Sequence, residues 1–303
     1  EVETPCLVPA PGMEVHLRGF RTVFEPHLGA GIAQPLWLRT SPELALKRLL
    51  VAGAGPVFEL ARVWRNGEVG RTHAPEFTML EWYRPGLTLD GLMDEAEALV
   101  RALCPPGVAH HGVETDLTLQ FERITCAEAF ARWVGMDLLA SIRPDGSGDA
   151  AALGAQPGES WEDAFFRLLL DHVEPHLGRA RGSFLTHWPA PQAALARRDP
   201  HDPRVALRFE MFVGGVELAN AFDELTDAAE QRARFTHDVA ERVRLHGADN
   251  AWPVDEDFLA ALDHGMPAGS GIALGFDRLA MLASGARRIE DVLWLGGFPA
   301  LPG

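Results

Sequence analysis

Apolar and polar positions alternate with a period of two in some stretches of the chain and with a helical period in others. Between residues 35 and 85, strand-like stretches flank one helical segment, SPELALKRLLVAG (41–53), with Ser41 as expected N-cap and Glu43 in the first turn. The segment TLDGLMDEAEALVRALC (88–104) has helical spacing and begins with Thr88. This part of the chain therefore predicts strands combined with two helices.

From about residue 107 to 200 the pattern predicts mostly helices, broken by a loop rich in Gly, Pro and Ser at 142–160. RFEMFVGGVELAN (208–220) predicts two strands joined by a turn at Gly214 and Gly215, and a polar helix follows at 226–247. GSGIALGFDRLAMLASG (269–285) predicts a short strand that runs into a helix. Without an internal repeat or a long linker, we expect a single domain over 1–303, with a helical excursion at 107–200.

Composition narrows the classes of function. The net charge is −16, with 27 Lys and Arg against 43 Asp and Glu, which disfavours extensive contact with tRNA or DNA, because binding a phosphate backbone relies on Lys and Arg. No apolar run approaches the roughly 18 residues that span a bilayer, and the first residues lack a secretion signal. Cys6, Cys104 and Cys126 suit neither a disulfide framework nor a zinc site. We therefore expect a cytoplasmic protein, without membrane contact.

The stretch RNGEVGRTHAPEFTMLEWYRP (65–85) concentrates polar groups. A strand over EFTMLEWY would present an aromatic plate, a carboxylate and a phenol on one face, from Phe77, Met79, Glu81 and Tyr83. A preceding strand ends at Arg65, so a hairpin would gather Arg65, Arg71 and His73 at one end, where they could hold a polyphosphate. A hairpin with a solvated charged face is the alternative at this point.

The predicted hairpin at 208–220 carries a second constellation. If Phe212 faces Glu217, then Glu210 lies diagonally across on the same face, within reach of a shared divalent cation. Without a cation, their repulsion would raise one pKa, or both would point into water. Asn220 and Glu224 add an amide and a carboxylate, a combination suited to an amine-bearing substrate.

Arg278 is placed in the first turn of the last predicted helix. Helix starts and guanidinium groups both attract phosphate. Tight packing of the glycine-rich strand is the alternative explanation for this motif.

Taken together, these stretches resemble motifs 2 and 3 of class II aminoacyl-tRNA synthetases of the lysyl type, and EVETP, with Pro5, resembles the end of motif 1. The resemblance runs from residue 1 to about 295. Four segments look most like the freestanding lysyl-tRNA synthetase paralogues that join (R)-β-lysine to elongation factor P. They are LWLRTSPELALKRLLVAG, HAPEFTMLEWYRPG, GVELANAFDELTDAAEQ and MPAGSGIALGFDRLAML.

The resemblance implies an α+β fold, the class II aminoacyl-tRNA synthetase catalytic core, with an antiparallel β-sheet flanked by helices and a homodimer formed through motif 1. It also implies that the protein uses ATP and Mg²⁺. Arg65 would hold the α-phosphate and the substrate carboxylate, Phe77 would stack under adenine, and Arg278 would bind the γ-phosphate. The further ATP contacts implied are Asn66, Gly67, His73, Glu217 and Gly275.

The resemblance implies that Glu210 and Glu217 are the ligands of the metal ion. For the amino acid, it implies that Glu43 and Glu81 bind the amine nearer the carboxylate and that Asn220 binds the carboxylate. The terminal ammonium would bind Tyr83 and Glu224, with Ser41 and Ala273 also at this site. Lysyl-tRNA synthetases usually have glycine where this chain has Ala273, and alanine favours (R)-β-lysine over lysine.

The implied reaction is formation of an aminoacyl adenylate and its transfer to a lysine ε-amine of elongation factor P. The chain begins inside motif 1, so we expect no anticodon-binding domain. The alternatives are a shortened synthetase that charges tRNA and a weakly catalytic paralogue that binds nucleotide or amino acid. Two residues depart from the family's usual motif and bear on the alternative of a weakly catalytic paralogue. Gly67 replaces a common glutamate, with Glu68 next to it, and Ala74 replaces an asparagine.

Overall fold

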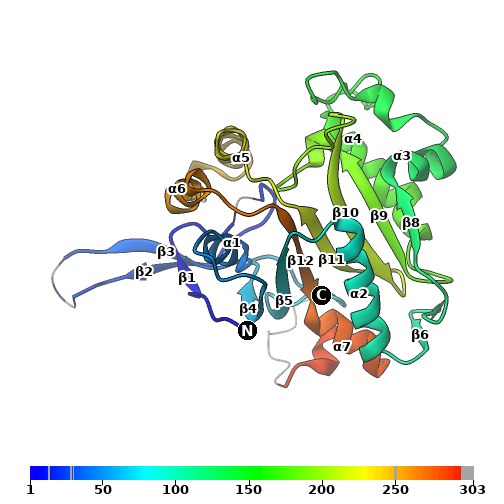
Figure 1. The fold of residues 1–303 in the computed structure, drawn as a ribbon, viewed down its shortest axis with the longest axis horizontal. Helices are drawn as coiled ribbons and strands as arrows, with labels where there is room; N and C mark the ends of the chain where they lie inside the picture. The colour runs from blue at the N-terminus through cyan, green and yellow to red at the C-terminus, as the bar shows by residue number, and fades with distance from the viewer. Residues whose placement is uncertain (13, 28, 30, 249–250, 295–303) are drawn as a thin grey trace.

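A computed structural model describes residues 1–12, 14–27, 29, 31–248 and 251–294. Its central sheet has seven strands in the order β4-β5-β12-β11-β10-β9-β8 (Figure 1). The strands are β4 (Val57–Trp64), β5 (Glu76–Pro85), β8 (Glu122–Thr125), β9 (Ser183–Pro189), β10 (Val205–Val213), β11 (Val216–Asp223) and β12 (Gly269–Gly275). Only β8 and β9 pair in parallel. The expected antiparallel sheet flanked by helices is thus confirmed, apart from this edge pair.

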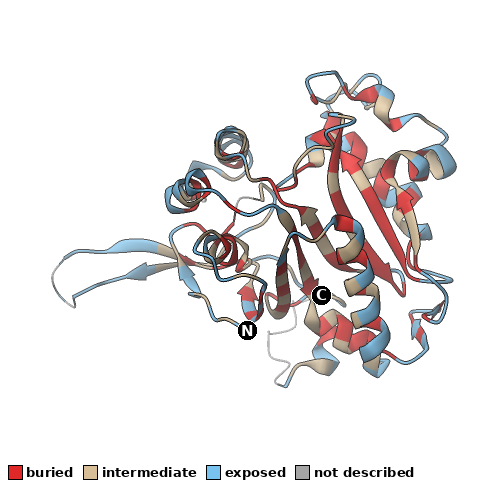
Figure 2. Ribbon diagram, viewed as in Figure 1, coloured by how far each residue is buried: buried red, intermediate tan, exposed pale blue. Residues whose placement is uncertain are grey.

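Helices cover both faces of the sheet because its strands alternate their side chains. On β5, Leu80 and Trp82 pack with α2 (Leu89–Leu103) and α7 (Phe276–Ser284), whereas Tyr83 packs on the opposite face. That face meets a cluster which includes residues of α1 (Glu43–Val51), α5 (Ala228–His246) and α6 (Glu256–His264). A third cluster joins α3 (Cys126–Ala129) and α4 (Trp161–Leu168) to β8 and β9. Figure 2 shows the buried strands between these layers.

The predicted helices and the glycine turn are confirmed with small shifts. Thr88 caps α2, and α5 begins after its N-cap Asp227. Gly214 and Gly215 have φ angles of 65° and 71°, the left-handed values that a two-residue hairpin turn needs. The N-cap of α1 is Pro42 rather than Ser41. The Ser41 hydroxyl still accepts a hydrogen bond from the backbone N–H of Glu43, at 3.0 Å.

The segment 107–200 contains the expected helices, among them α3 and α4, but the prediction missed four strands. The segment contains β6 (Gly107–His110) and β7 (Val113–Asp116), which form a separate hairpin, as well as β8 and β9 of the central sheet. Strand β9 is buried on both faces, so its sequence lacks the alternation that reveals a strand, and the other three are only four residues long. In the described ranges, the short helical turns are Phe130–Val134, Leu138–Ser141, Leu169–Val173, Glu174–His176, Ala190–Gln192 and Ile289–Val292.

A small sheet in the order β1-β3-β2 lies beside the central one. Its strands are β1 (Leu7–Val8), β2 (Arg21–Phe24) and β3 (Gln34–Leu38). The hairpin of β2 and β3 extends away from the body of the molecule (Figure 1). In the described part of the chain, no helix combines the length and apolarity needed to cross a membrane. The end of the expected single domain, 295–303, lies outside the described residues.

A register shift in the β10–β11 hairpin sets the orientation of the site. Phe212 pairs with Glu217, as the sequence predicted, but Met211 pairs with Ala219. One extra residue of β11 is accommodated between these pairs, as in a β-bulge. Glu217 and Asn220, three residues apart, consequently face the same side of the sheet.

Candidate functional site

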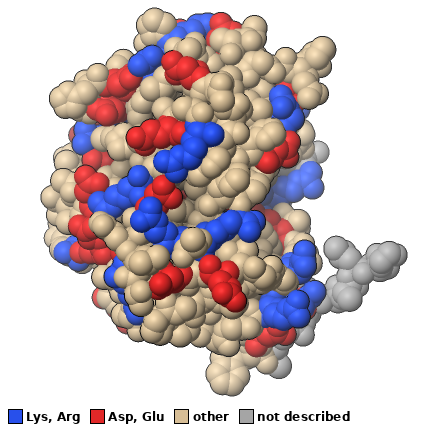
Figure 3. All heavy atoms as spheres, turned by 90° about the vertical axis from the view of Figure 1, so that its right-hand side faces the viewer, with Lys and Arg blue, Asp and Glu red and all other residues tan. Residues whose placement is uncertain are grey.

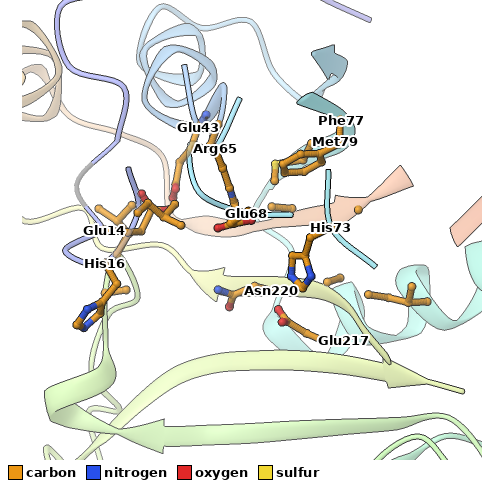
Figure 4. A pocket seen from close by; sticks show the side chains of 18 of the residues that line it. Glu14, His16, Glu43, Arg65, Glu68, His73, Phe77, Met79, Glu217 and Asn220 are labelled. Carbon is orange, nitrogen blue, oxygen red and sulfur yellow. Dashed lines mark hydrogen bonds and ion pairs between the residues drawn. The ribbon is translucent and has the colours of Figure 1, made fainter. Parts of the chain in front are cut away.

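A cavity of about 510 Å³ lies on the face of the sheet that carries Phe77 of β5, Ala273 of β12 and Asn220 of β11 (Figure 4). The loop after β4 borders one end, and the start of α1 borders the other. Cross-strand pairing aligns Glu81, Ala273, Asn220 and Glu210 in one row across four strands. The row connects the residues expected at the amino acid with those expected at the metal.

Arg65 follows the last residue of β4 and extends over an aromatic ring at the end of the cavity where the nucleotide is expected. Its guanidinium carbon is 5.3 Å from the centroid of the Phe77 ring, and its Nη1 is 4.0 Å from a carboxylate oxygen of Glu68. The Arg65 Nε is buried and has no hydrogen-bond partner in the described part of the chain. A cationic group with an unused donor above an aromatic plate suits a phosphate next to a stacked base.

Arg278, in the first turn of α7, holds two other elements together. It donates from Nη1 to the Glu217 carbonyl (2.8 Å) and from Nε to the Thr72 carbonyl (3.1 Å). Its Nη2 lies 2.5 Å from Nε2 of His73. Burial, followed by the charge of Arg278, lowers the pKa of His73 to about 4, so the imidazole is neutral and accepts this hydrogen bond.

Arg208 on β10 organises two of the expected site residues. It donates from Nη2 to Glu210 (2.5 Å) and from Nε to the side-chain oxygen of Asn220 (3.1 Å), and it stacks over the ring of Trp188. Because the Asn220 oxygen is engaged by Arg208, the amide nitrogen is the group that remains to donate to a carboxylate.

The expected metal ligands interact through their charges. Burial, followed by the charge of Glu217, raises the pKa of Glu210 to about 8. Two such carboxylates fit Mg²⁺, which commonly takes one or two protein carboxylates and completes its shell with phosphate oxygens and water. Among the described residues, no group of three or more His, Cys, Asp or Glu side chains forms a metal site.

A buried ion-pair cluster closes the opposite end of the cavity. The Lys47 ammonium lies 2.6 Å from an oxygen of Glu43 and 2.6 Å from an oxygen of Glu224. The second oxygen of Glu224, Oε1, has no hydrogen-bond partner in the described ranges. Burial raises the pKa of Glu224 to about 8, although Lys47 opposes this shift. The cluster leaves acceptor capacity for an additional cationic group.

Glu81 lies below the cavity floor and is fully buried. One of its oxygens accepts from the Ser41 hydroxyl (2.6 Å) and the other from the Tyr83 hydroxyl (3.0 Å). Burial, followed by the charge of Glu43, raises the pKa of Glu81 to about 8. In this arrangement Glu81 orients Ser41 and Tyr83 rather than opening onto the cavity.

The sixteen expected site residues therefore divide into two groups. Those that line the cavity are Ser41, Glu43, Arg65, His73, Phe77, Glu217, Asn220, Ala273, Gly275 and Arg278. Those that do not are Asn66, Gly67, Glu81, Tyr83, Glu210 and Glu224, most of which support the lining from behind or from the adjoining loop. The structure thus brings the predicted constellation to one site in two layers.

Two residues with evident roles were missing from the sequence prediction. Arg208 lies two residues before Glu210 on the same strand face, a spacing that could have identified it. Lys47 lies four residues after Glu43, but this spacing is usual for solvent-exposed helical ion pairs and gave no sign of burial. At the two positions where the sequence departs from the family pattern, Gly67 has a φ of 88°, and Ala74 lines the cavity, as does Glu68.

Comparison with known proteins gives consistent matches over nearly the whole chain. A family model described as tRNA synthetases class II (D, K and N) matches residues 1–299. The chain is 45% identical over 299 residues to the "Elongation factor P--(R)-beta-lysine ligase" of Edwardsiella ictaluri, covering 97% of this chain and 87% of that protein. Proteins of the same name from Sodalis glossinidius and Proteus mirabilis are 44% and 43% identical, with the same coverage.

Proposed function

Since the chain belongs to the class II tRNA synthetases of the D, K and N type, we propose that it is an ATP-dependent ligase which activates (R)-β-lysine and transfers it to elongation factor P. The observation that carries this proposal is the sequence identity of 43–45%, over 97% of the chain, to ligases of that name. The cavity supports it, because a nucleotide end rich in cations adjoins an amine-binding end rich in carboxylates.

In the first step, a carboxylate oxygen of the amino acid attacks the α-phosphorus of ATP. A new P–O bond forms, the bond to the β-phosphate oxygen breaks, and pyrophosphate leaves. Arg65 neutralises charge at the α-phosphate, Phe77 stacks under adenine, and Arg278 with His73 holds the triphosphate. These residues position the reactants and stabilise charge, so no protein nucleophile is needed.

Ligases of this class use ATP and typically Mg²⁺. Glu210 and Glu217 would hold the ion, with Asn66, Gly67 and Gly275 next to the nucleotide. When bound, Mg²⁺ supplies neutralisation of phosphate charge. Arg208 keeps Glu210 oriented toward this position through its 2.5 Å ion pair.

The diamino acid lies between Asn220 and the carboxylate cluster. Asn220 donates its amide nitrogen to the substrate carboxylate, and Glu43 receives the nearer amine with help from Glu81 and Ser41. Glu224 and Tyr83 contact the terminal ammonium, and Ala273 forms part of the floor between the two ends. In the second step, the acceptor lysine ε-amine attacks the adenylate carbonyl, an amide bond forms, AMP leaves and the amine loses its proton.

A protein acceptor fits the charge of the chain better than tRNA does. The net charge is −16, and tRNA binding would require many Lys and Arg contacts to phosphates. On the face shown in Figure 3, basic and acidic side chains are interspersed rather than separated. Arg123 pairs with both Asp90 and Asp94.

A second copy of the chain is the partner that best fits the β2–β3 hairpin. Val23, Phe24 and Ile32 expose 62%, 45% and 55% of their surface along this projection. Phe58 and Leu60 on the edge strand β4 are also exposed. Apolar side chains along a hairpin and a sheet edge are features that a protein interface covers. We therefore propose a homodimer.

The decisive experiment is amino-acid-dependent exchange of pyrophosphate into ATP with Mg²⁺, followed by mass measurement of elongation factor P. Exchange that prefers (R)-β-lysine to lysine, with the mass of the acceptor increased by one β-lysyl group, is the expected result. Preference for lysine and charging of tRNA would identify a shortened synthetase instead. Binding of ATP or amino acid without exchange would identify a weakly catalytic paralogue.

A further inference from the structure

Lys47 is enclosed at the junction of α1, β5 and β11. Only 1% of its surface is exposed, and its ammonium lies about 6 Å from the rings of Tyr83 (6.0 Å) and Phe222 (5.9 Å). Although burial disfavours the charge, the Glu224 and Glu43 carboxylates raise the pKa of Lys47 above its ordinary value. The side chain is therefore a permanent internal cation.

Lys47 does not line the cavity, whereas Glu43 does. Its ammonium is 2.6 Å from Oε1 of Glu43 and 2.6 Å from Oε2 of Glu224. Each carboxylate thus has one oxygen fixed by Lys47 and one oxygen not fixed by it. Any effect of Lys47 on the substrate has to pass through these two carboxylates.

The remaining oxygen of Glu224 needs a partner. Oε1 is buried and accepts no hydrogen bond within the described ranges. It lies 2.4 Å from the position that a Cβ at Gly271 would occupy, so glycine leaves room beside it. A buried carboxylate oxygen without a donor is unfavourable, and a substrate ammonium would supply that donor.

The charges of the cluster match a substrate with two amines. The charge of Glu43 acts on both Glu81 and Glu224, and the charge of Lys47 acts on all three carboxylates. When all three carboxylates are ionised, they and the one ammonium carry a formal charge of −2, which two substrate ammonium groups neutralise. Without Lys47, mutual repulsion and burial would favour proton binding by the carboxylates still more strongly.

We propose that Lys47 is a positioning residue for the amino acid: its ammonium links the carboxylate that receives one substrate amine to the carboxylate that receives the other. The proposal rests on the proposed function, because the two amines belong to the diamino acid activated there. Lys47 fixes the relative position of the two acceptors and balances part of their charge.

Charged groups from several elements face this cluster. Glu43 faces Lys47 on its own helix and Glu14 from the N-terminal segment. Glu224 faces Lys47, Glu43 and the neighbouring Asp223. Among these groups, Lys47 is the only cation that acts on both Glu43 and Glu224, so its removal raises both carboxylate pKa values.

The test is Lys47→Met, which keeps the apolar stem and removes the charge. We expect the KM for the diamino acid in pyrophosphate exchange to rise roughly tenfold or more at pH 7, because buried acceptors lose their partner, with the KM for ATP little changed. The wild-type KM should fall as the pH rises through about 8, where Glu224 ionises. The KM of Lys47→Met should fall only at a higher pH, because loss of the ammonium raises the carboxylate pKa values further, while the amines have ordinary pKa values near 10. A defect in packing alone would not shift this pH dependence.

Arg48→Met is the matched control. Arg48 is the next residue on the same helix, and its one ion pair with the residues that the structure describes is an exposed contact with Asp257 at 4.0 Å. Its loss should leave both KM values unchanged. An unchanged amino-acid KM in folded Lys47→Met, or a loss that is independent of pH, overturns the proposal.

If Lys47→Met does not fold, the same substitution is tested in a protein that already carries Glu224→Gln. Glu224→Gln removes one buried charge, and Lys47→Met added to it should still raise the amino-acid KM in a pH-dependent way through Glu43. Absence of that effect overturns the proposal. Calorimetric titration with lysine and with (R)-β-lysine distinguishes failure of the proposed function from failure of the role of Lys47. If the wild-type protein binds neither amino acid, the proposed function is overturned. If the wild-type protein binds and the Lys47 variants bind equally well, only the role of Lys47 is overturned.

Discussion

Arg65 has a buried donor that no described group satisfies, above a ring placed for stacking. We expect Arg65→Ala to lower the rate of pyrophosphate exchange by about 10²–10³-fold or more, because charge at the reacting phosphate is no longer neutralised. Arg62→Ala is the control, since Arg62 is exposed on the preceding strand and does not line the cavity. Near-normal exchange by Arg65→Ala would refute the role given to this residue.

Glu81 links pH to stability. Its pKa in the folded protein is about 8, because of burial and then the charge of Glu43, whereas an unfolded chain has an ordinary value near 4.3. The folded state therefore binds the extra proton between these values, and the stability contributed by this proton is lost as the pH rises toward and through about 8.

Glu81→Gln, which resembles the protonated side chain, should therefore flatten this dependence. Compared with wild type, its melting temperature should be similar near pH 5 and higher by a few degrees near pH 8.5 in the absence of substrates. Thermal unfolding across this range measures the effect. Melting curves of the two proteins that shift in parallel with pH would count against the ionisation of Glu81 as the cause.

Ala273 lies between Glu81 and Asn220 in the row across the sheet. Ala273→Gly removes one methyl group from the floor of the amino-acid site. We expect the ratio of kcat/KM for lysine over (R)-β-lysine to increase roughly tenfold, the usual scale for one carbon in a pocket, with a stability loss of about 0.5–1 kcal/mol from glycine in a strand. An unchanged ratio would mean that the methyl does not contribute to substrate selection.

At the residue scale, the sequence resemblance predicted which side chains come together at the cavity but not how deeply each one is buried. Glu81 was expected to contact the substrate, yet both its oxygens are occupied by Ser41 and Tyr83. The sequence cannot distinguish a carboxylate at a surface from one below it, because burial depends on neighbours distant in the chain. Lys47 was missed for the same reason.

At the scale of the element, glycine in β12 makes space for the acidic cluster. A Cβ at Gly271 would lie 2.2 Å from a Tyr83 ring carbon and 2.4 Å from Oε1 of Glu224. Gly271→Ala should therefore raise the KM for the diamino acid roughly tenfold or more, since overpacking displaces both groups. Gly107→Ala is the control, because nothing lies within 4 Å of its Cβ position and its φ is not left-handed. Equal KM values for the two variants would contradict this explanation.

The elements that were predicted have clear markers in the sequence, and the elements that were missed have no such markers. The hairpin at Gly214 and Gly215 was predicted by its turn residues, and Thr88 identified the start of α2. The bulge opposite Met211 had no such marker, although it decides that Asn220 faces the cavity. Period-two alternation also fails for β9, whose two faces are both buried.

At the scale of the whole molecule, the projecting hairpin predicts the state of association. Sedimentation should give the mass of two chains, and Val23→Asp with Phe24→Asp should shift the population toward one chain, because charge on an apolar interface opposes burial. Leu170→Asp is a control at another exposed apolar residue, 55% exposed on a short helical turn. A wild-type protein that sediments as a single chain would exclude the homodimer.

The position of β12 also has a consequence for synthesis of the chain. This strand comprises residues 269–275, yet it lies between β5 and β11 near the centre of the sheet. Until the ribosome has released it, the nascent chain presents two unpaired strand edges, which are prone to association with other chains. Its pairing with β5 is also strongly non-local and hence intrinsically slow. The newly made protein should therefore depend on chaperones most strongly just before this strand emerges.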